Sequence, residues 1–253
     1  SIESIFDQAN GSYSVVCLVA DHGLLAFRDP YGLRPLIWGK KKSGTLSSGY
    51  AHMVASESVA LNFNEYEVVR DLQPGEVLYV NQKGEAFHKV LRSKGKRHCM
   101  FEWVYFASAE SVLEGVPVYR CRAELGKNLA QLLKGELKKR KLKPDVVAPV
   151  PDTSRTAALA LAEDLGIPYR EILIKNRYIK RTFILASDRK RKREVSLKLS
   201  PVRSEIEGKR VILVDDSIVR GTTSRKLIEL VRKAGAKEVY FVSTCPPIQF
   251  PCY

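Results

Sequence analysis

Short runs of alternating hydrophobic and polar residues occupy the first hundred positions, and turn-forming residues separate them. Alternation with a period of two residues is typical of β-strands that bury one face. Turns such as Asp21-His22-Gly23 join neighbouring runs closely enough for antiparallel pairing. The pattern therefore predicts a mostly antiparallel sheet, with strands at Tyr13–Val19, Gly23–Phe27, Leu36–Lys40, Met53–Ser56, Val77–Val80 and Ala86–Val90.

From about Arg120 the hydrophobic spacing lengthens to that of a helix. The spacing predicts one apolar helical face made of Leu125, Leu129, Leu132 and Leu133. Beyond this helix, buried apolar strands alternate with helices, which is typical of parallel βαβ units that bind ligands at the carboxyl ends of their strands. The predicted strands are Val146–Val150, Val211–Val214 and Glu238–Thr244, and the predicted helices are Thr156–Leu165 and Ser224–Ala234.

The change of pattern predicts a domain boundary near residue 100, between a domain at 1–100 and a domain at 101–253. The chain begins without Met, in the helix-like segment Ile2–Phe6, and stops at Tyr253 after a Pro-rich turn. We therefore expect an interior piece of a longer protein, cut at both ends.

Composition narrows the class of protein. With 253 residues, 45% of them hydrophobic, the chain can bury one large core or two ordinary ones. Its net charge of +14 suits nucleic acid, an anionic membrane surface or a heavily phosphorylated small substrate, and charge alone does not choose among them. Five widely spaced cysteines, the lack of an apolar run of about 18 residues and the lack of a signal pattern favour a soluble protein of the cytoplasm.

The segment 211–224 carries the most specific chemistry. An apolar strand delivers Asp215 and Asp216, and a loop of small hydroxyl residues and Gly221 leads straight into a helix. Paired carboxylates can accept hydrogen bonds from vicinal ribose hydroxyls or hold hydrated Mg²⁺. A helix start can surround a phosphate with N–H groups and hydroxyls. A structural alternative, with Thr223 or Ser224 as an ordinary helix N-cap, explains one hydroxyl but not the acid pair with four hydroxyls.

This segment resembles the phosphoribosyl-pyrophosphate (PRPP) signature of type I phosphoribosyltransferases, in the form found in the amidophosphoribosyltransferases. By that resemblance, Asp215 and Asp216 hold the ribose and the metal. The same resemblance assigns the 5′-phosphate to Ser217, Arg220, Gly221, Thr222, Thr223 and Ser224.

Other stretches resemble the same family in the same order. Residues 148–155 resemble its pyrophosphate loop, with Asp152, Thr153 and Ser154 binding PRPP and Thr153 also contacting the metal. Residues 175–183 resemble its mobile catalytic loop, and the resemblance makes Lys175, Arg177 and Arg181 the catalytic cations. Residues 11–16, 27–36 and 54–58 resemble the later half of its glutaminase domain. The implied fold combines an antiparallel Ntn-hydrolase-like sheet (α+β) with a type I phosphoribosyltransferase parallel βαβ domain (α/β).

The resemblance implies that ammonia derived from glutamine attacks C1 of PRPP, giving 5-phosphoribosylamine and pyrophosphate with Mg²⁺ as cofactor, the first step of purine synthesis. It also implies purine nucleotides as feedback inhibitors and a homotetramer. The family's N-terminal cysteine nucleophile has no counterpart in this sequence. We therefore expect no glutaminase activity from the chain alone.

Cys99 and Cys252 stand where one subclass of the family has ligands of a [4Fe-4S] cluster. Two further cysteines would have to come from beyond the chain, because such a cluster needs four thiolates. The alternative is a pair of packed thiols. We expect the cluster in the full-length protein and expect Cys17, Cys121 and Cys245 to be packed.

Two other functions share part of the pattern. A PRPP-sensing, DNA-binding regulator would use the acid pair and the positive charge, but it predicts neither the glutaminase-like half nor the loop at 175–183. A phosphoribosyltransferase for a free purine or pyrimidine base is the second. The basic runs 138–141 and 189–193 lack interleaved aromatic residues, so solvated surface is the default and we expect neither nucleic acid nor membrane as a partner.

Overall fold

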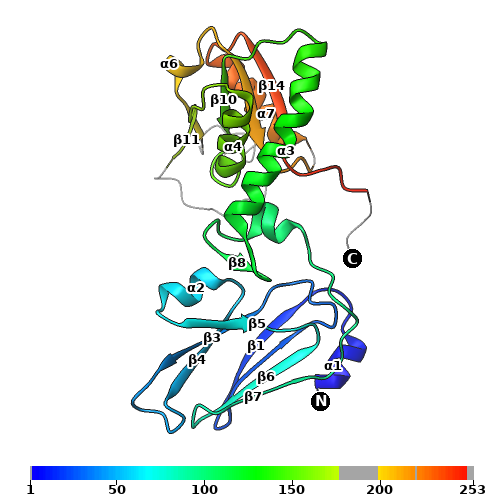
Figure 1. Cartoon of the computed structure of the whole chain (residues 1–253), viewed down its shortest axis with the longest axis vertical. Coiled ribbons are helices and arrows are strands. Elements are labelled where there is room, and N and C mark those ends of the chain that lie inside the picture. Colours follow the sequence, from blue (N-terminus) through cyan, green and yellow to red (C-terminus); the bar gives the residue numbers. More distant parts are fainter. Residues whose placement is uncertain (1, 177–198, 220, 250–253) are drawn as a thin grey trace, which may run out of the picture. The chain divides into compact units, whose positions relative to one another are not determined.

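The computed structural model describes residues 2–176, 199–219 and 221–249. These residues form two compact units, one reaching Val118 and the other beginning at Tyr119 (Figure 1). Each unit has its own sheets and its own hydrophobic core. The two units are described separately below.

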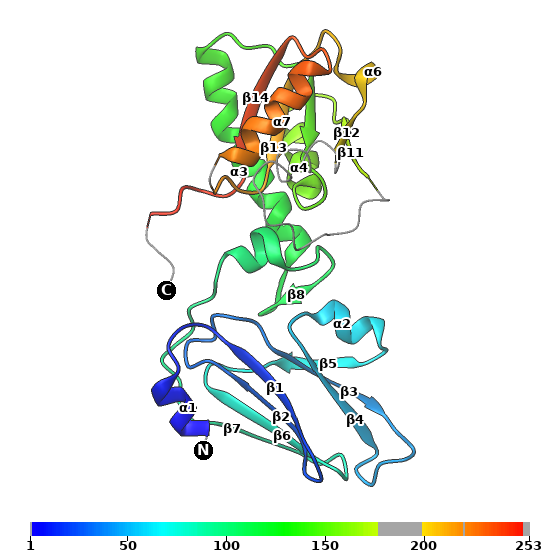
Figure 2. The same cartoon turned by 180° about the vertical axis from the view of Figure 1, so that it is seen from behind.

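Two antiparallel sheets build the first unit, as the alternating pattern predicts (Figure 2). One sheet has the order β1-β2-β6-β7 and consists of Ser14–Val19, Gly23–Arg28, Glu76–Asn81 and Ala86–Val90. The other has the order β4-β3-β5 and consists of Tyr50–Ala55, Ile37–Lys42 and Glu67–Asp71. Helices α1 (Ile2–Gln8) and α2 (Ser58–Phe63) complete this part. The sequence pattern did not predict α2 or β5.

The turn between β1 and β2 shows why glycine is needed there. Gly23 pairs with Val19 across the turn and has a φ of +142°, which a residue with a side chain rarely adopts. A Cβ at this position would also lie 2.0 Å from the carbonyl oxygen of Val80 on β6. Glycine at position 23 therefore allows both the turn between β1 and β2 and the close approach of β6.

Residues 101–118 pack with the first unit through buried polar contacts. They include the π-helix η1 (Glu102–Phe106) and the short strands β8 (Val112–Leu113) and β9 (Val116–Pro117). Glu57 accepts hydrogen bonds from the Ser108 N–H at 2.7 Å and the Ser111 hydroxyl at 2.9 Å. The buried guanidinium of Arg28 pairs with Glu114 at 2.5 Å. The observed division between units consequently falls after Val118, whereas the sequence pattern changes near residue 100.

The Phe27–Leu36 segment, which resembled the family's glutaminase half, has a structural role in this unit. The carboxylate of Asp29 is fully buried and accepts the N–H groups of Tyr31 and Leu33, both at 2.9 Å. Arg28 donates to the carbonyl oxygens of Gly32 and Leu72, at 2.7 and 2.6 Å. These bonds fix the irregular path between β2 and β3.

A three-stranded parallel sheet in the order β10-β13-β14 forms the centre of the second unit, as predicted. Its strands are Val146–Pro149, Arg210–Asp215 and Glu238–Ser243. The helices are α3 (Val118–Lys139), α4 (Arg155–Leu165), α6 (Arg203–Ile206) and α7 (Thr222–Lys233). A separate antiparallel pair, β11 (Leu173–Lys175) and β12 (Leu199–Pro201), completes the unit.

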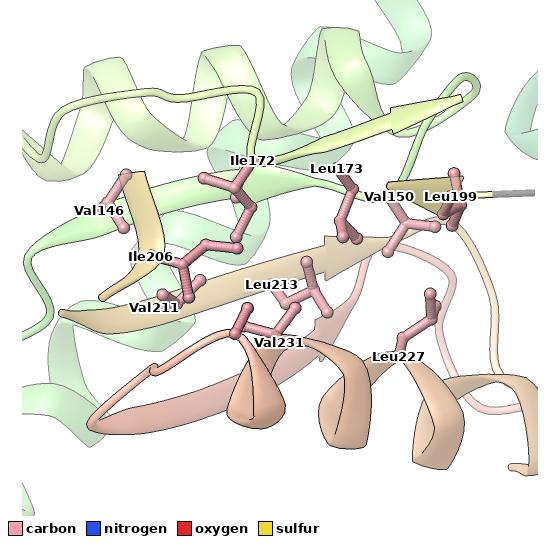
Figure 3. Close-up of a cluster of buried hydrophobic side chains, with 12 residues drawn as sticks. Val146, Val150, Ile172, Leu173, Leu199, Ile206, Val211, Leu213, Leu227 and Val231 are labelled. Atoms are coloured by element: carbon pink, nitrogen blue, oxygen red, sulfur yellow. The ribbon is translucent and has the colours of Figure 1, made fainter. Parts of the chain in front are cut away.

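The central strand β13 is buried on both faces, because successive side chains of a strand point to opposite sides. Val211 and Leu213 pack with Leu227 and Val231 of α7 (Figure 3). Ile212 and Val214 belong to a second cluster with residues of α3 and α4. This double burial explains the continuous apolar run that the sequence shows at 211–214.

The prediction that Leu132 lies on the buried face of α3 was wrong. Leu132 is 72% exposed, while Leu129 and Leu133 pack against the buried cluster around Ala130. Position 132 lies about 200° around the helix from position 130, at roughly 100° per residue, so the two face opposite sides. Leu132 therefore lies beyond the edge of the buried face, although its spacing from Leu125 and Leu129 placed it in the predicted apolar face. No helix in the described ranges is both long and apolar enough to span a membrane.

Candidate active site

Asp215 and Asp216 lie at the carboxyl end of the central strand β13, where the neighbouring strands also end. The parallel ladder continues into this end of the sheet. The N–H of Val150 donates to the Val214 carbonyl at 2.8 Å, and the N–H of Thr244 donates to the Asp215 carbonyl at 3.0 Å. Open parallel sheets bind their ligands at this edge.

Asp216 has both carboxylate oxygens occupied. The Thr153 hydroxyl, from the loop after β10, donates to Oδ2, and the Ser217 hydroxyl donates to Oδ1 at 2.8 Å. Asp216 is only 6% exposed, so these bonds replace the water that burial removes. The pair of carboxylates is thus linked to the predicted pyrophosphate loop.

The carboxylate of Asp215 has fewer hydrogen-bond donors than that of Asp216 in the described part of the chain. Among the described residues, its carboxylate accepts one hydrogen bond, from the Asp216 N–H at 3.0 Å. Burial first, and the neighbouring negative charge of Asp216 second, raise the pKa of Asp215 from 3.8 to about 7. A cation or a hydroxyl donor placed here would relieve both unfavourable effects.

The start of α7 offers N–H groups without a side-chain cap. Gly221 is the N-cap residue, with a φ of +67°, and no side chain within the described ranges accepts its first N–H groups. Thr222 and Thr223 are exposed, and the Ser224 hydroxyl donates to the Gly221 carbonyl at 3.0 Å. The N-cap interpretation of Thr223 or Ser224 is therefore wrong, and the helix start keeps the donors that a phosphate needs.

The loop after β10 holds its hydroxyls in a similar way. The buried Ser154 precedes α4, and its hydroxyl donates to the Val150 carbonyl rather than accepting from the helix. Asp152 is exposed and pairs with Lys175 at 2.7 Å and with Arg155 at 3.2 Å. Lys175 ends β11, so the first residue of the predicted catalytic loop contacts the predicted pyrophosphate loop.

The described structure places a large part of the predicted site at one edge of the sheet. Two predicted groups, the acid pair and the loop after β10, share a hydrogen bond, and Lys175 joins the second by an ion pair. Four other predicted site residues lie outside the described residues: Arg177, Arg181, Arg220 and Cys252.

Sequence reasoning missed the residues that brace this edge from β14. Ser243 and Thr244 donate their hydroxyls to the Asp216 carbonyl, at 3.3 and 3.4 Å, and the Cys245 N–H donates to it at 2.9 Å. Their position at the carboxyl end of the next parallel strand was the available signal.

The cysteines divide differently from the expectation. Cys99 is half-buried in the first unit, and Cys17, expected to be packed, is exposed, as are the other residues of the second half of β1. Burial raises the pKa of both Cys121 and Cys245, as packed thiols should show. Within the described ranges, no cluster of three or more His, Cys, Asp or Glu side chains is arranged to hold a metal ion.

The protein-family model for the phosphoribosyl transferase domain matches residues 122–249, which include β10, β13, α7 and both loops of the candidate site. The chain belongs to the phosphoribosyltransferase family. The match covers the parallel sheet and the helices on both of its faces, so the predicted parallel βαβ fold is confirmed.

Relatives of this phosphoribosyltransferase extend the match to the first unit. Proteins named amidophosphoribosyltransferase share 42% identity over 252 residues in Pseudomonas aeruginosa and 46% over 254 residues in Methanothermobacter thermautotrophicus. These alignments cover 99% and 100% of this chain but 49% and 50% of the relatives. The chain thus spans about half the length of the curated relatives it matches, and the resemblance seen in its motifs is confirmed.

Solved structures agree with the sequence relatives. A glutamine PRPP amidotransferase from B. subtilis, complexed with ADP and GMP, matches 99% of this chain with a TM-score of 0.81 and 40% identity. A structure described as the allosteric regulatory enzyme of purine biosynthesis matches the same share with a TM-score of 0.81 and 39% identity. This chain covers 52% and 51% of those structures, respectively. The similarity to these structures therefore covers both units, the first with its antiparallel sheets and the second with its parallel sheet.

Proposed function

We propose that the protein containing this chain is an amidophosphoribosyltransferase, which joins ammonia to C1 of PRPP and releases pyrophosphate. The observation that carries the proposal is the acid pair of β13, joined to the loop after β10 and followed by the uncapped start of α7. Relatives with this name match both units at 42–46% identity. A match over both units favours this activity over a DNA-binding regulator or a free-base transferase.

Each part of the site has a task in this reaction. The α7 start with Thr222, Thr223 and Ser224 would hold the 5′-phosphate, because its uncapped N–H groups and helix dipole favour an anion. Asp215 would accept a ribose hydroxyl, which supplies the donor it lacks in the free chain. Thr153 and its neighbours would contact the pyrophosphate. By resemblance, Arg220 would also contact the 5′-phosphate.

Lys175 would act on the leaving group together with Arg177 and Arg181. In the described structure its ammonium group is half exposed and pairs with Asp152 beside Thr153. A cation here meets negative charge as it develops on departing pyrophosphate, so its contribution should appear in the transition state. Lys175→Ala should therefore lower kcat more than it raises KM, and an unchanged kcat with a raised KM would refute the catalytic role.

The acid pair fits Mg²⁺ by its chemistry. Hard carboxylate and hydroxyl oxygens at the site match the preference of this ion. Burial and the charge of Asp216 raise the pKa of Asp215, and a bound cation would favour its ionised form. Asp215, Asp216 and Thr153 would hold it together with substrate oxygens. When bound, Mg²⁺ would neutralise charge on the pyrophosphate.

The remaining parts of the proposal concern the whole protein. We assign residues 1–100 to the later part of a glutaminase domain and residues 101–253 to the chain's transferase part, of which residues 101–118 pack with the first unit. Glutamine is the proposed source of ammonia. Purine nucleotides are proposed as inhibitors, since the B. subtilis relative was solved with ADP and GMP. We further propose a homotetramer in the cytoplasm.

A [4Fe-4S] cluster in the full-length protein is also proposed, with Cys99 and Cys252 as two of its four ligands. Cys99 is half-buried and not paired in a disulfide, as a cluster ligand must be. Iron and sulfide analysis of anaerobic full-length protein tests this, with Cys121→Ser as the control that should keep iron and Cys252→Ser as the variant that should lose it. Iron-free, fully active protein would refute it.

Pyrophosphate release tests the main proposal. Full-length protein with PRPP, Mg²⁺ and ammonium salts should release pyrophosphate, and Asp215→Asn should lower kcat/KM for PRPP with ammonia as well as with glutamine. Glu229→Gln, an exposed acid on α7, is the matched control and should stay active. The proposal fails if ammonia supports no release, or if Asp215→Asn impairs only the glutamine-dependent reaction.

The basic run at 138–141 needs no nucleic-acid partner. Lys138 and Lys139 are exposed in the last turn of α3, where the helix dipole favours cations. Arg140 pairs with Glu136 at 2.8 Å. The run at 189–193 lies outside the described residues.

A further inference from the structure

The hydrogen bond between Thr153 and Asp216 joins the loop proposed to contact the pyrophosphate to the acid pair that, by resemblance, holds the ribose. Thr153 would contact the pyrophosphate, and Asp216 would contact the ribose. In the described structure these groups instead satisfy each other, at a position where Asp216 is almost completely buried.

The bond cannot persist when both contacts to substrate form. A threonine hydroxyl has one proton, so donating it to a pyrophosphate oxygen takes it away from Asp216. Asp216 Oδ2 then lacks a donor, and a ribose hydroxyl can supply one. Pyrophosphate therefore makes Asp216 a better acceptor for the ribose, and a ribose hydroxyl on Oδ2 weakens the hold of Asp216 on Thr153.

The surrounding contacts hold both partners in place while this exchange occurs. The main-chain carbonyl of Asp216 is bound by Ser243 at 3.3 Å and by Cys245 at 2.9 Å. The loop that carries Thr153 is tied to the sheet through Val150, whose carbonyl accepts the Ser154 hydroxyl. Exchange thus requires only the Thr153 hydroxyl to change partner.

We propose that the Thr153–Asp216 hydrogen bond is an internal substitute for substrate, which couples the pyrophosphate half and the ribose 5-phosphate half of the site. This inference rests on the proposed function. Pyrophosphate that takes the Thr153 proton breaks the bond, and a ribose hydroxyl then meets an Asp216 oxygen without a competing donor. By thermodynamic linkage the coupling is reciprocal, and each half strengthens the other by the same factor.

Binding of the two halves to the 253-residue chain, measured by calorimetry at one pH, tests the coupling. The probes are ribose 5-phosphate and magnesium pyrophosphate. Thr153→Val has no hydroxyl, so Asp216 Oδ2 has lost the Thr153 donor from the start, and ribose 5-phosphate alone should bind severalfold more tightly than to wild type. For each protein, the affinity for ribose 5-phosphate is measured with and without saturating magnesium pyrophosphate, and the ratio of the two affinities is taken. This ratio should be about tenfold larger in wild type than in Thr153→Val, the factor expected for loss of one charge-assisted hydrogen bond.

Ribose 5-phosphate and pyrophosphate repel each other equally in wild type and in the variants, so a comparison between them cancels this repulsion. Thr153→Ser keeps the hydroxyl and should keep the coupling, as should Ser243→Ala, which alters a bond to the main chain of Asp216 but not to its carboxylate. Thr153→Ala removes the same donor if Thr153→Val does not fold. Equal ratios in wild type and Thr153→Val, with both ligands bound, would overturn the coupling alone. Wild type that binds neither ligand would overturn the proposed function and the coupling with it.

Discussion

Replacement of Asp215 by Asn should make the second unit more stable at pH 8, although it removes a proposed substrate contact. The Asp215 carboxylate is largely buried beside Asp216 and accepts one main-chain N–H in the described structure. These surroundings raise the pKa of Asp215 from 3.8 to about 7. Asparagine keeps the shape and the acceptor but cannot ionise, so it removes the buried charge.

The size of the effect follows from the difference in pKa between the folded and unfolded chains. Between about pH 4 and 7 the folded chain binds a proton at Asp215 that the unfolded chain releases, so stability falls as the pH rises through this window. A rise of about 3 pKa units corresponds to about 4 kcal/mol above pH 7, at about 1.36 kcal/mol per unit. Asp215 as a residue keeps part of its surface exposed, and screening by water reduces the effect, so we expect about 1–3 kcal/mol.

Urea unfolding followed by far-UV circular dichroism measures this difference. The circular dichroism signal is suitable because the long helices α3, α4 and α7 belong mainly to the second unit. Tryptophan fluorescence is not suitable, since both tryptophans, Trp38 and Trp103, lie in the first unit. The gain of Asp215→Asn over wild type should be small near pH 4, rise between about pH 4 and 7 and reach its full value at pH 8.

Asp216→Asn is the matched control for this experiment. Its carboxylate accepts two hydroxyl donors, so the substitution should destabilise the second unit by about 1 kcal/mol at pH 8. If Asp215→Asn were no more stable than wild type at pH 8, or if its gain did not depend on pH, the argument from buried charge would be refuted.

Two further predictions concern packing and pH. Gly126→Ala should destabilise the second unit by about 1–3 kcal/mol, because its Cβ would lie 2.1 Å from the Ala157 carbonyl, whereas Gly135→Ala on the same helix meets open space and should gain up to about 1 kcal/mol in urea unfolding. Burial lowers the pKa of His52, whose Nδ1 accepts the Trp38 indole N–H at 2.9 Å, so the first unit should lose stability as the pH falls below about 6.5. His52→Leu should flatten that pH dependence in fluorescence-detected unfolding, and an unchanged slope would refute the assignment.

Much of the second unit could be predicted because its pattern is local. The run at 211–214 is apolar throughout, and the double burial of β13 explains why. Asp215 and Asp216 follow directly, so their place at the strand end required only the rule for parallel sheets. The loop after β10 was placed in the same way.

Contacts between distant segments could not be predicted from such patterns. Thr153 and Asp216 are 63 positions apart, and nothing in either segment shows which hydroxyl reaches which carboxylate oxygen. Residues 101–118 join the first unit through Glu57 and Arg28, which are also distant in sequence. The prediction for Leu132 was wrong for a different reason: helical spacing groups it with its apolar neighbours but does not show how far around the helix the buried face extends.

The fold treats the two adjacent acids differently, and this difference links stability to binding. Among the described residues, Asp216 has two hydroxyl donors, whereas Asp215 has one N–H donor and a raised pKa. The buried apolar side chains of β13 contribute about 1.5–3 kcal/mol each, so this strand can offset the charge at its end. A ligand that supplies a cation or a hydroxyl donor to Asp215 recovers part of that cost. Ligand binding should consequently stabilise the second unit more at pH 8, where Asp215 is charged, than at pH 5, where it carries a proton.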